Sequence, residues 1–208
     1  MKALIIKDIL NLKGQYKMIF GILVFYAVLS LSSSDANFLF GMISIILTML
    51  TITSISYDER SKWDKYALTM PISRQDIVIS KYLLGLILAL VALALNLIFV
   101  VLLGDLPVKE SIATSFALFG ISLLFLSFML PALFKYGVEK GRFIMLLIFF
   151  VPTAIVIIAS KLDIIEMISD IISNIPFSQV ILVLIILLMI IVAISIMASI
   201  RIYKNKEM

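Results

Sequence analysis

The sequence contains no cysteine and no histidine. The first absence excludes disulfide bonds, thiolate catalysis and cysteine-ligated metal sites, and the second removes the most frequent general base and metal ligand. Charged residues are also scarce, at 14% of the chain, whereas hydrophobic residues make up 63% and mean hydropathy is +1.21. A soluble domain has roughly a quarter charged residues. Only a membrane protein tolerates a surface of this composition.

Charge is missing altogether from six long apolar stretches, and a helix that crosses the bilayer needs about 20 such residues. The predicted spans are residues 18–34, 38–56, 82–103, 112–134, 143–160 and 177–200. With no polar block long enough for a soluble domain, residues 1–208 are predicted to form a single transmembrane domain. The expected fold is an all-α polytopic membrane protein with six transmembrane helices.

The basic residues are distributed unevenly between the two sides that these spans define. Of the 17 Lys and Arg residues, 15 fall in the N-terminal segment, loop 57–81, loop 135–142 and the C-terminal tail. Short cytoplasmic loops carry an excess of Lys and Arg. Both termini and loop 57–81 are therefore predicted to be cytoplasmic.

The N-terminal stretch "ALIIKDILNLK" is predicted to be an amphipathic helix that lies on the membrane surface and ends at Gly14. Its apolar face comprises Ile5, Ile6, Ile9 and Leu12, and its polar face comprises Lys7, Asp8 and Asn11. Lys2 and Lys13 fall near the apolar side. The alternative is a basic flank that only anchors the first span.

A second amphipathic helix is predicted on the outer side, between the fifth and sixth spans. In "KLDIIEMISDIISNIP", residues 161–176, isoleucines recur at helical spacing on one face, and Pro176 ends the pattern. This helix would pack over the outer mouth of the bundle, or it would lie in the outer leaflet without a gating role.

No catalytic, cofactor-binding or metal-binding motif is recognisable in the chain, which is therefore not expected to be an enzyme. The phosphate-binding pattern G-x-x-x-x-G-K-[ST] is absent, and so are the paired groups of intramembrane proteases. Nothing indicates a nucleic-acid partner. Candidate polar residues of a translocation path are Asn96, Thr51 and Ser122, although such residues commonly pack membrane helices together.

Loop 57–81 is the most polar internal segment and holds the only tryptophan. A helix over residues 59–70 would place Trp63, Tyr66, Ala67 and Met70 on one stripe, and Pro71 would end it. Ser73 and Asp76 have capping-box spacing and predict the start of the next helix. Aromatic residues and Met are enriched in protein interfaces, whereas Trp and Tyr also anchor proteins at lipid headgroups. Both interpretations fit the pattern.

The stretch "YDERSKWDKYALTMPISRQDIVISKYLLG" resembles the segment between the second and third spans of ABC-2-type permeases. The matching positions are Asp58, Glu59, Leu68, Pro71, Ser73, Arg74, Val78, Lys81 and Tyr82. One departure is Met70 before the proline. The remainder of the chain is similar to the family only in its layout.

The resemblance implies that residues 59–69 form a coupling helix, which docks on a separate ATP-binding subunit, and that the N-terminal segment is the elbow helix. Two permeases, identical or homologous, and two ATP-binding subunits would form one transporter. ATP and Mg²⁺ would be bound by the partner and no cofactor by this chain. The implied docking residues are Glu59, Trp63, Tyr66, Met70, Pro71, Ser73 and Arg74.

The implied function is that of a permease subunit of an ATP-driven exporter in the cytoplasmic membrane of a bacterium. The small size is similar to that of permeases for amphipathic peptides, such as phenol-soluble modulins and some bacteriocins, so an amphipathic or hydrophobic cargo is expected. The alternative is a non-transporting membrane scaffold or immunity protein, which binds a partner or a peptide.

Overall fold

The computed structural model describes residues 2–33, 36–67, 69–103, 108–161 and 177–205. The elements are α1 (Lys2–Leu12), η1 (Lys13–Gln15), α2 (Tyr16–Ser33), α3 (Ala36–Arg60), α4 (Trp63–Ala67), α5 (Arg74–Leu103), α6 (Val108–Lys161) and α8 (Phe177–Lys204). Every element in these ranges is helical, which confirms the all-α class. The outer amphipathic helix predicted within 161–176 lies almost wholly outside the described residues.

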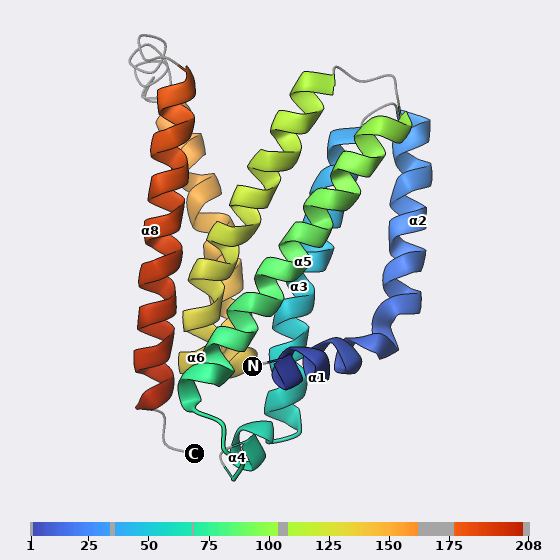
Figure 1. Ribbon diagram of the computed structural model, residues 1–208. Coiled ribbons are helices and arrows are strands. Elements are labelled where there is room, and N and C mark those ends of the chain that lie inside the picture. The colour runs from blue at the N-terminus through green and yellow to red at the C-terminus, as the bar shows by residue number, and fades with distance from the viewer. Residues whose placement is uncertain (1, 34–35, 68, 104–107, 162–176, 206–208) are drawn as a thin grey trace.

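The long helices run lengthwise along a bundle, and α1 lies across one end of it (Figure 1). The short helix α4 and both ends of the described chain lie at this same end, which we call the basic end (Figure 1). The N-terminal helix, the loop between α3 and α5 and the C-terminal residues thus share one side, as the charge distribution predicts. The assignment of the basic end to the cytoplasm stays a prediction.

Within the described residues, five helical stretches are long and apolar enough to cross a membrane. They are Lys2–Leu29, Phe38–Arg60, Arg74–Leu102, Val108–Gly141 and Gln179–Lys204, the first of which combines α1 with α2. A further apolar helix, Phe143–Ile158, is shorter than these five. The chain is therefore a multi-pass membrane protein, and the predicted span at 143–160 is helical but shorter than the rest.

The chain reverses within the predicted loop 135–142, but the residues on both sides of the reversal are helical, so the loop is reduced to a break within α6. Gly137 has φ 77° and ψ 173°, a backbone conformation that is essentially restricted to glycine. The two halves of α6 on either side of this break run in opposite directions along the bundle (Figure 1). A single glycine therefore replaces the expected eight-residue connection.

Two clusters of buried side chains form the core of the part of the chain that the structure describes. One lies toward the basic end and includes Ile55, Met129 and Tyr203, and the other includes Phe40 and Ile43. A small network of hydroxyl groups attaches helix α8 to the bundle. Tyr82 Oη bonds Ser195 Oγ at 2.5 Å and Ser199 Oγ at 2.8 Å, and Ser195 Oγ donates to the carbonyl of Ser127 at 2.5 Å. The opposite face of α8 is exposed and apolar, as expected of a helix that contacts lipid.

Candidate functional site

Four charged side chains from three helices meet at the basic end, and we call them the ion cluster: Lys7 and Asp8 of α1, Asp58 of α3 and Lys81 of α5. Lys7 Nζ lies 2.9 Å from Asp8 Oδ1 and 2.6 Å from Asp58 Oδ1. Lys81 Nζ lies 2.8 Å from Asp8 Oδ1 and 2.6 Å from Asp58 Oδ2. Lys81 also donates to Ser54 Oγ at 2.9 Å. Two cations and two anions make the ion cluster neutral.

The ion cluster is largely closed to solvent. The exposed fractions of the side chains are 21% for Lys7, 1% for Asp8, 8% for Asp58 and 3% for Lys81. Removing one partner from a buried ion pair leaves an uncompensated charge and is strongly destabilising. The ion cluster therefore fixes α1, α3 and α5 to one another at the end of the bundle where α4 lies.

The orientation of α1 differs from the predicted one. Leu4, Asp8 and Leu12 face the bundle and are buried, whereas Ile6 and Ile9, which the sequence places on the apolar face, are exposed. Asp8 faces inward because Lys81 neutralises it there. The apolar isoleucines are thereby left on the surface, where an interfacial helix contacts lipid.

The predicted helix over residues 59–70 is interrupted. Helix α3 continues to Arg60, Lys62 adopts φ 51°, and α4 then covers only Trp63–Ala67. A left-handed residue just past the end of a helix is a common helix-ending conformation, because it lets backbone N–H groups bond the last carbonyls. Here the N–H of Ser61 donates to the carbonyl of Tyr57, and that of Lys62 donates to the carbonyl of Glu59.

The predicted docking stripe is divided between the interior and the surface. Ala67 is fully buried, and Trp63 is half-buried against the core cluster at the basic end. Lys7 Nζ lies 4.6 Å from the centroid of the Trp63 ring, a cation–π contact that joins α4 to α1. Tyr66 and Met70 are 62% and 46% exposed. Only these last two present a large apolar surface to a partner.

Polar contacts hold the corner after α4. The predicted capping box is confirmed: Asp76 N–H donates to Ser73 Oγ at 3.1 Å, and Ser73 N–H donates to Asp76 Oδ2 at 3.1 Å. Arg74 donates to the carbonyl of Lys204, in the last turn of α8, at 2.5 Å. Pro71 is exposed between α4 and this cap. The corner is therefore attached to both α5 and α8.

Glu59 makes its contact within the chain, to α6. Its Oε2 accepts a hydrogen bond of 2.7 Å from the backbone N–H of Val138, the residue after the break. A small cavity of about 30 Å³ lies beside it, and its lining includes Asp58, Lys81 and Tyr203. Among the described residues, no group of three or more acidic side chains is arranged to hold a metal ion.

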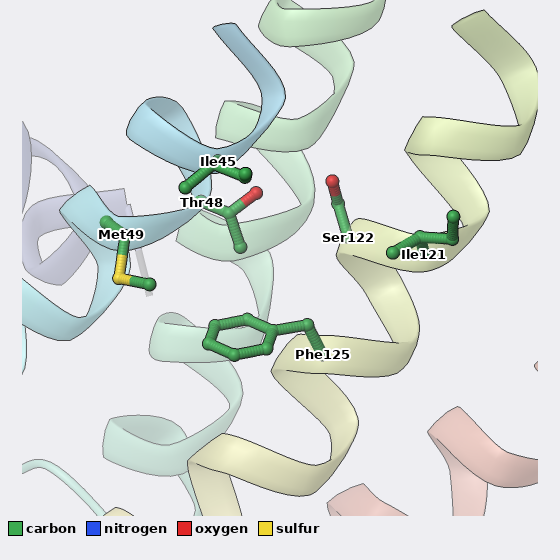
Figure 2. A pocket seen from close by; sticks show the side chains of 6 residues that line it. All are labelled: Ile45, Thr48, Met49, Ile121, Ser122 and Phe125. Atoms are coloured by element: carbon green, nitrogen blue, oxygen red, sulfur yellow. The ribbon is translucent and has the colours of Figure 1, made fainter. Parts of the chain in front are cut away.

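The three candidate path residues have different surroundings in the structure. Asn96 is fully buried and donates to Ser44 Oγ at 3.1 Å, which is the interhelical bond that polar residues in membrane helices commonly make. Thr51 is also fully buried. Ser122 borders a cavity of about 70 Å³ between α3 and α6 (Figure 2). This cavity is lined by Ile45, Thr48, Met49, Ile121, Ser122 and Phe125.

Sequence reasoning missed the ion cluster as a unit. Asp58 and Lys81 belong to the stretch that carries the family resemblance, but the helical pattern places Lys7 and Asp8 on the polar face of an interfacial helix. One signal could have indicated the contact: Leu4, Asp8 and Leu12 recur at i, i+4 and i+8, so the acidic residue shares a face with two leucines. An acidic residue on a face that is otherwise apolar indicates that a buried cation lies next to it.

Comparison with known proteins agrees with this architecture. No curated protein sequence and no solved structure matches the chain significantly. The family model described as ABC-2 family transporter protein matches residues 3–204, nearly the whole chain. Membership of this family implies association with an ABC ATP-binding subunit. Because the match covers more than half of the chain, this protein belongs to the ABC-2 transporter family.

Proposed function

We propose that this chain is the permease subunit of an ATP-driven exporter and that a separate ATP-binding subunit docks on residues 63–73. The observation that supports this docking site is that some side chains of the segment are buried and others are exposed. Trp63 and Ala67 hold it against the core, whereas Tyr66 and Met70 are exposed. Exposed aromatic and Met side chains on a firmly attached loop are suited to partner binding.

The contacts around the loop suggest how force reaches the spans. Glu59 bonds the break in α6, the Ser73 cap begins α5, and Arg74 bonds the end of α8. A displacement of the docked loop would therefore be delivered to α3, α5, α6 and α8 together. In this proposal ATP and Mg²⁺ are bound by the partner, and this chain performs no catalysis.

The proposed cargo is amphipathic or hydrophobic, with a peptide as the favoured class, because the central parts of the spans carry no charge. Ligand pockets usually have volumes of about 300–1,000 Å³. The cavity between α3 and α6 measures about 70 Å³ and is too small for such a cargo. We therefore place the path between two permease chains, each with six spans including 143–160, served by two ATP-binding subunits.

Co-purification tests this proposal. The permease is isolated in detergent from its natural host, and the retained ATP-binding subunit is quantified for wild type, Tyr66→Ala and Met70→Ala. Truncating a central interface aromatic costs at least ~2 kcal/mol, about a thirtyfold loss of affinity. Thr114→Ala is the control, because Thr114 is partly exposed at the opposite end of the bundle, where its hydroxyl donates to the carbonyl of Glu110 in its own helix. Full retention by both loop variants would remove the docking site.

The alternative scaffold or immunity protein predicts a different outcome. It would form a stable complex with another protein or a peptide and would contain no ATP-binding subunit. Transport by reconstituted vesicles separates the two further, since only the exporter accumulates a labelled amphipathic peptide when ATP is supplied.

A further inference from the structure

The outward face of α1 has a charge pattern that the docking loop does not use. Lys2, Ile6 and Ile9 of α1, with Lys13 at the start of η1, follow one another at spacings of 4, 3 and 4 residues and therefore lie on one side of this helical segment. All four are exposed, Ile6 by 56% and Ile9 by 50%. We call these four residues the outward stripe. Two apolar side chains lie between two cations, one at each end.

Among the described residues, no acid forms an ion pair with Lys2 or Lys13. The one acidic residue of α1, Asp8, points into the bundle and is paired with Lys81 at 2.8 Å. The outward stripe is therefore purely cationic and apolar. Helices of this kind bury their apolar residues at the boundary of headgroups and acyl chains, and their lysines reach the lipid phosphates. The complementary surface is a bilayer that contains anionic phospholipids.

The inward face of α1 contacts the loop that carries Tyr66 and Met70. Lys7 lies 2.6 Å from Asp58 and 4.6 Å from the centroid of the Trp63 ring. Trp63 begins α4. The outward stripe and the contact with α4 are therefore on the same short helical segment. A shift of α1 at the lipid surface changes the position of Lys7 relative to Trp63.

We propose that the outward stripe binds the headgroups of anionic phospholipids and that Lys7 and Trp63 transmit this binding to the loop at residues 63–73. Lipid binding by the outward stripe does not depend on the proposed function. Its consequence for docking rests on that function, because it requires the loop to hold an ATP-binding subunit.

The tryptophan provides a readout in the permease alone. Trp63 is the only tryptophan in the chain, so its fluorescence reports on the contact with Lys7. The purified full-length permease is placed in vesicles of phosphatidylcholine, with or without phosphatidylglycerol. We expect the emission maximum and the acrylamide quenching of Trp63 to differ between the two compositions. The difference should vanish in Lys2→Gln/Lys13→Gln and persist in Lys135→Gln/Lys140→Gln, which removes two exposed charges from α6.

A second measurement detects the lipid itself. Phosphatidylglycerol retained on the permease is counted by native mass spectrometry after detergent extraction. Each lysine near an anionic surface contributes about a fivefold gain in binding, so the double variant of the outward stripe should bind roughly 25-fold more weakly. Equal retention by wild type and this variant would overturn the lipid site.

Two variants of Lys7 test the transmission. Lys7→Met should keep the bound phosphatidylglycerol and lose the lipid-dependent change at Trp63, and Lys7→Arg should keep both. A lipid-dependent change that survives in Lys7→Met would overturn the route through Lys7. None of these readouts requires the ATP-binding subunit, so a failure of the proposed function would leave them interpretable.

Discussion

The carboxylate of Glu59, near the end of α3, accepts a hydrogen bond of 2.7 Å from the backbone N–H of Val138, which lies 79 residues further along the chain. Val138 begins the second half of α6, directly after the break at Gly137. A carboxylate in this place satisfies an N–H group that has no partner in its own helix, and it complements the helix dipole. Helix α3 thereby stabilises the reversal of the chain in α6.

Gly137→Ala should destabilise the protein by about 1–3 kcal/mol, because a side chain at φ 77° is strained. The added Cβ would also lie 2.6 Å from Glu59 Oε1. The free energy of unfolding in SDS measures the effect. Gly120→Ala is the control, since its Cβ would meet no atom within 4 Å and should be neutral or stabilising by up to about 1 kcal/mol. Equal values for both variants would contradict the strain argument.

Lys81→Met should cost about 3–5 kcal/mol, because it leaves two acids and one cation in a buried site. Lys140→Met, on the exposed surface, should change stability by less than about 0.5 kcal/mol. Adding Asp8→Asn to Lys81→Met restores neutrality and should recover part of the loss. The midpoint of thermal unfolding in detergent gives the comparison. Losses that simply add would show that the charges do not interact.

The two aromatic residues of α4 should behave differently. Trp63→Ala removes a half-buried ring from the core and from Lys7, and it should cost about 1–3 kcal/mol of stability. Tyr66→Ala should stay within about 0.5 kcal/mol, because the side chain is 62% exposed. Thermal unfolding of the two variants without a partner checks this. A larger loss for Tyr66→Ala would mean that its ring packs within the permease.

The sidedness of the bundle can be tested by labelling, since the chain has no cysteine of its own. Lys65→Cys lies at the basic end, and Lys109→Cys lies at the start of α6, at the opposite end. An impermeant thiol reagent applied to intact cells should label position 109 and leave position 65 unmodified. Labelling at 65 would reverse the orientation that the distribution of Lys and Arg predicts.

The features that depend on local sequence could be predicted. Long charge-free stretches predict helices, and the capping box at Ser73 and Asp76 predicts the start of α5, because each signal lies within one helix or turn. The break at Gly137 could not be predicted in this way. Glu59, which contacts this break, belongs to another helix. The spacing of residues in the sequence does not predict a contact between two helices.

The candidate site was predictable only in part. Helical periodicity places Trp63, Tyr66 and Met70 on one stripe, but the stripe assumes an unbroken helix, and Lys62 interrupts it. The orientation of α1 was missed for a different reason. An amphipathic pattern shows which residues share a face, and it does not show that Asp8 finds a buried cation on α5.

The neutrality of the ion cluster also restricts how this sequence can evolve. A mutation that removes one of the four charges leaves the other three unbalanced in a site that excludes water, so the intermediate is selected against. Charges at positions 7, 8, 58 and 81 should therefore be gained, lost or exchanged in opposite-sign pairs among relatives. Such paired changes would mean that the N-terminal helix, α3 and α5 evolve together.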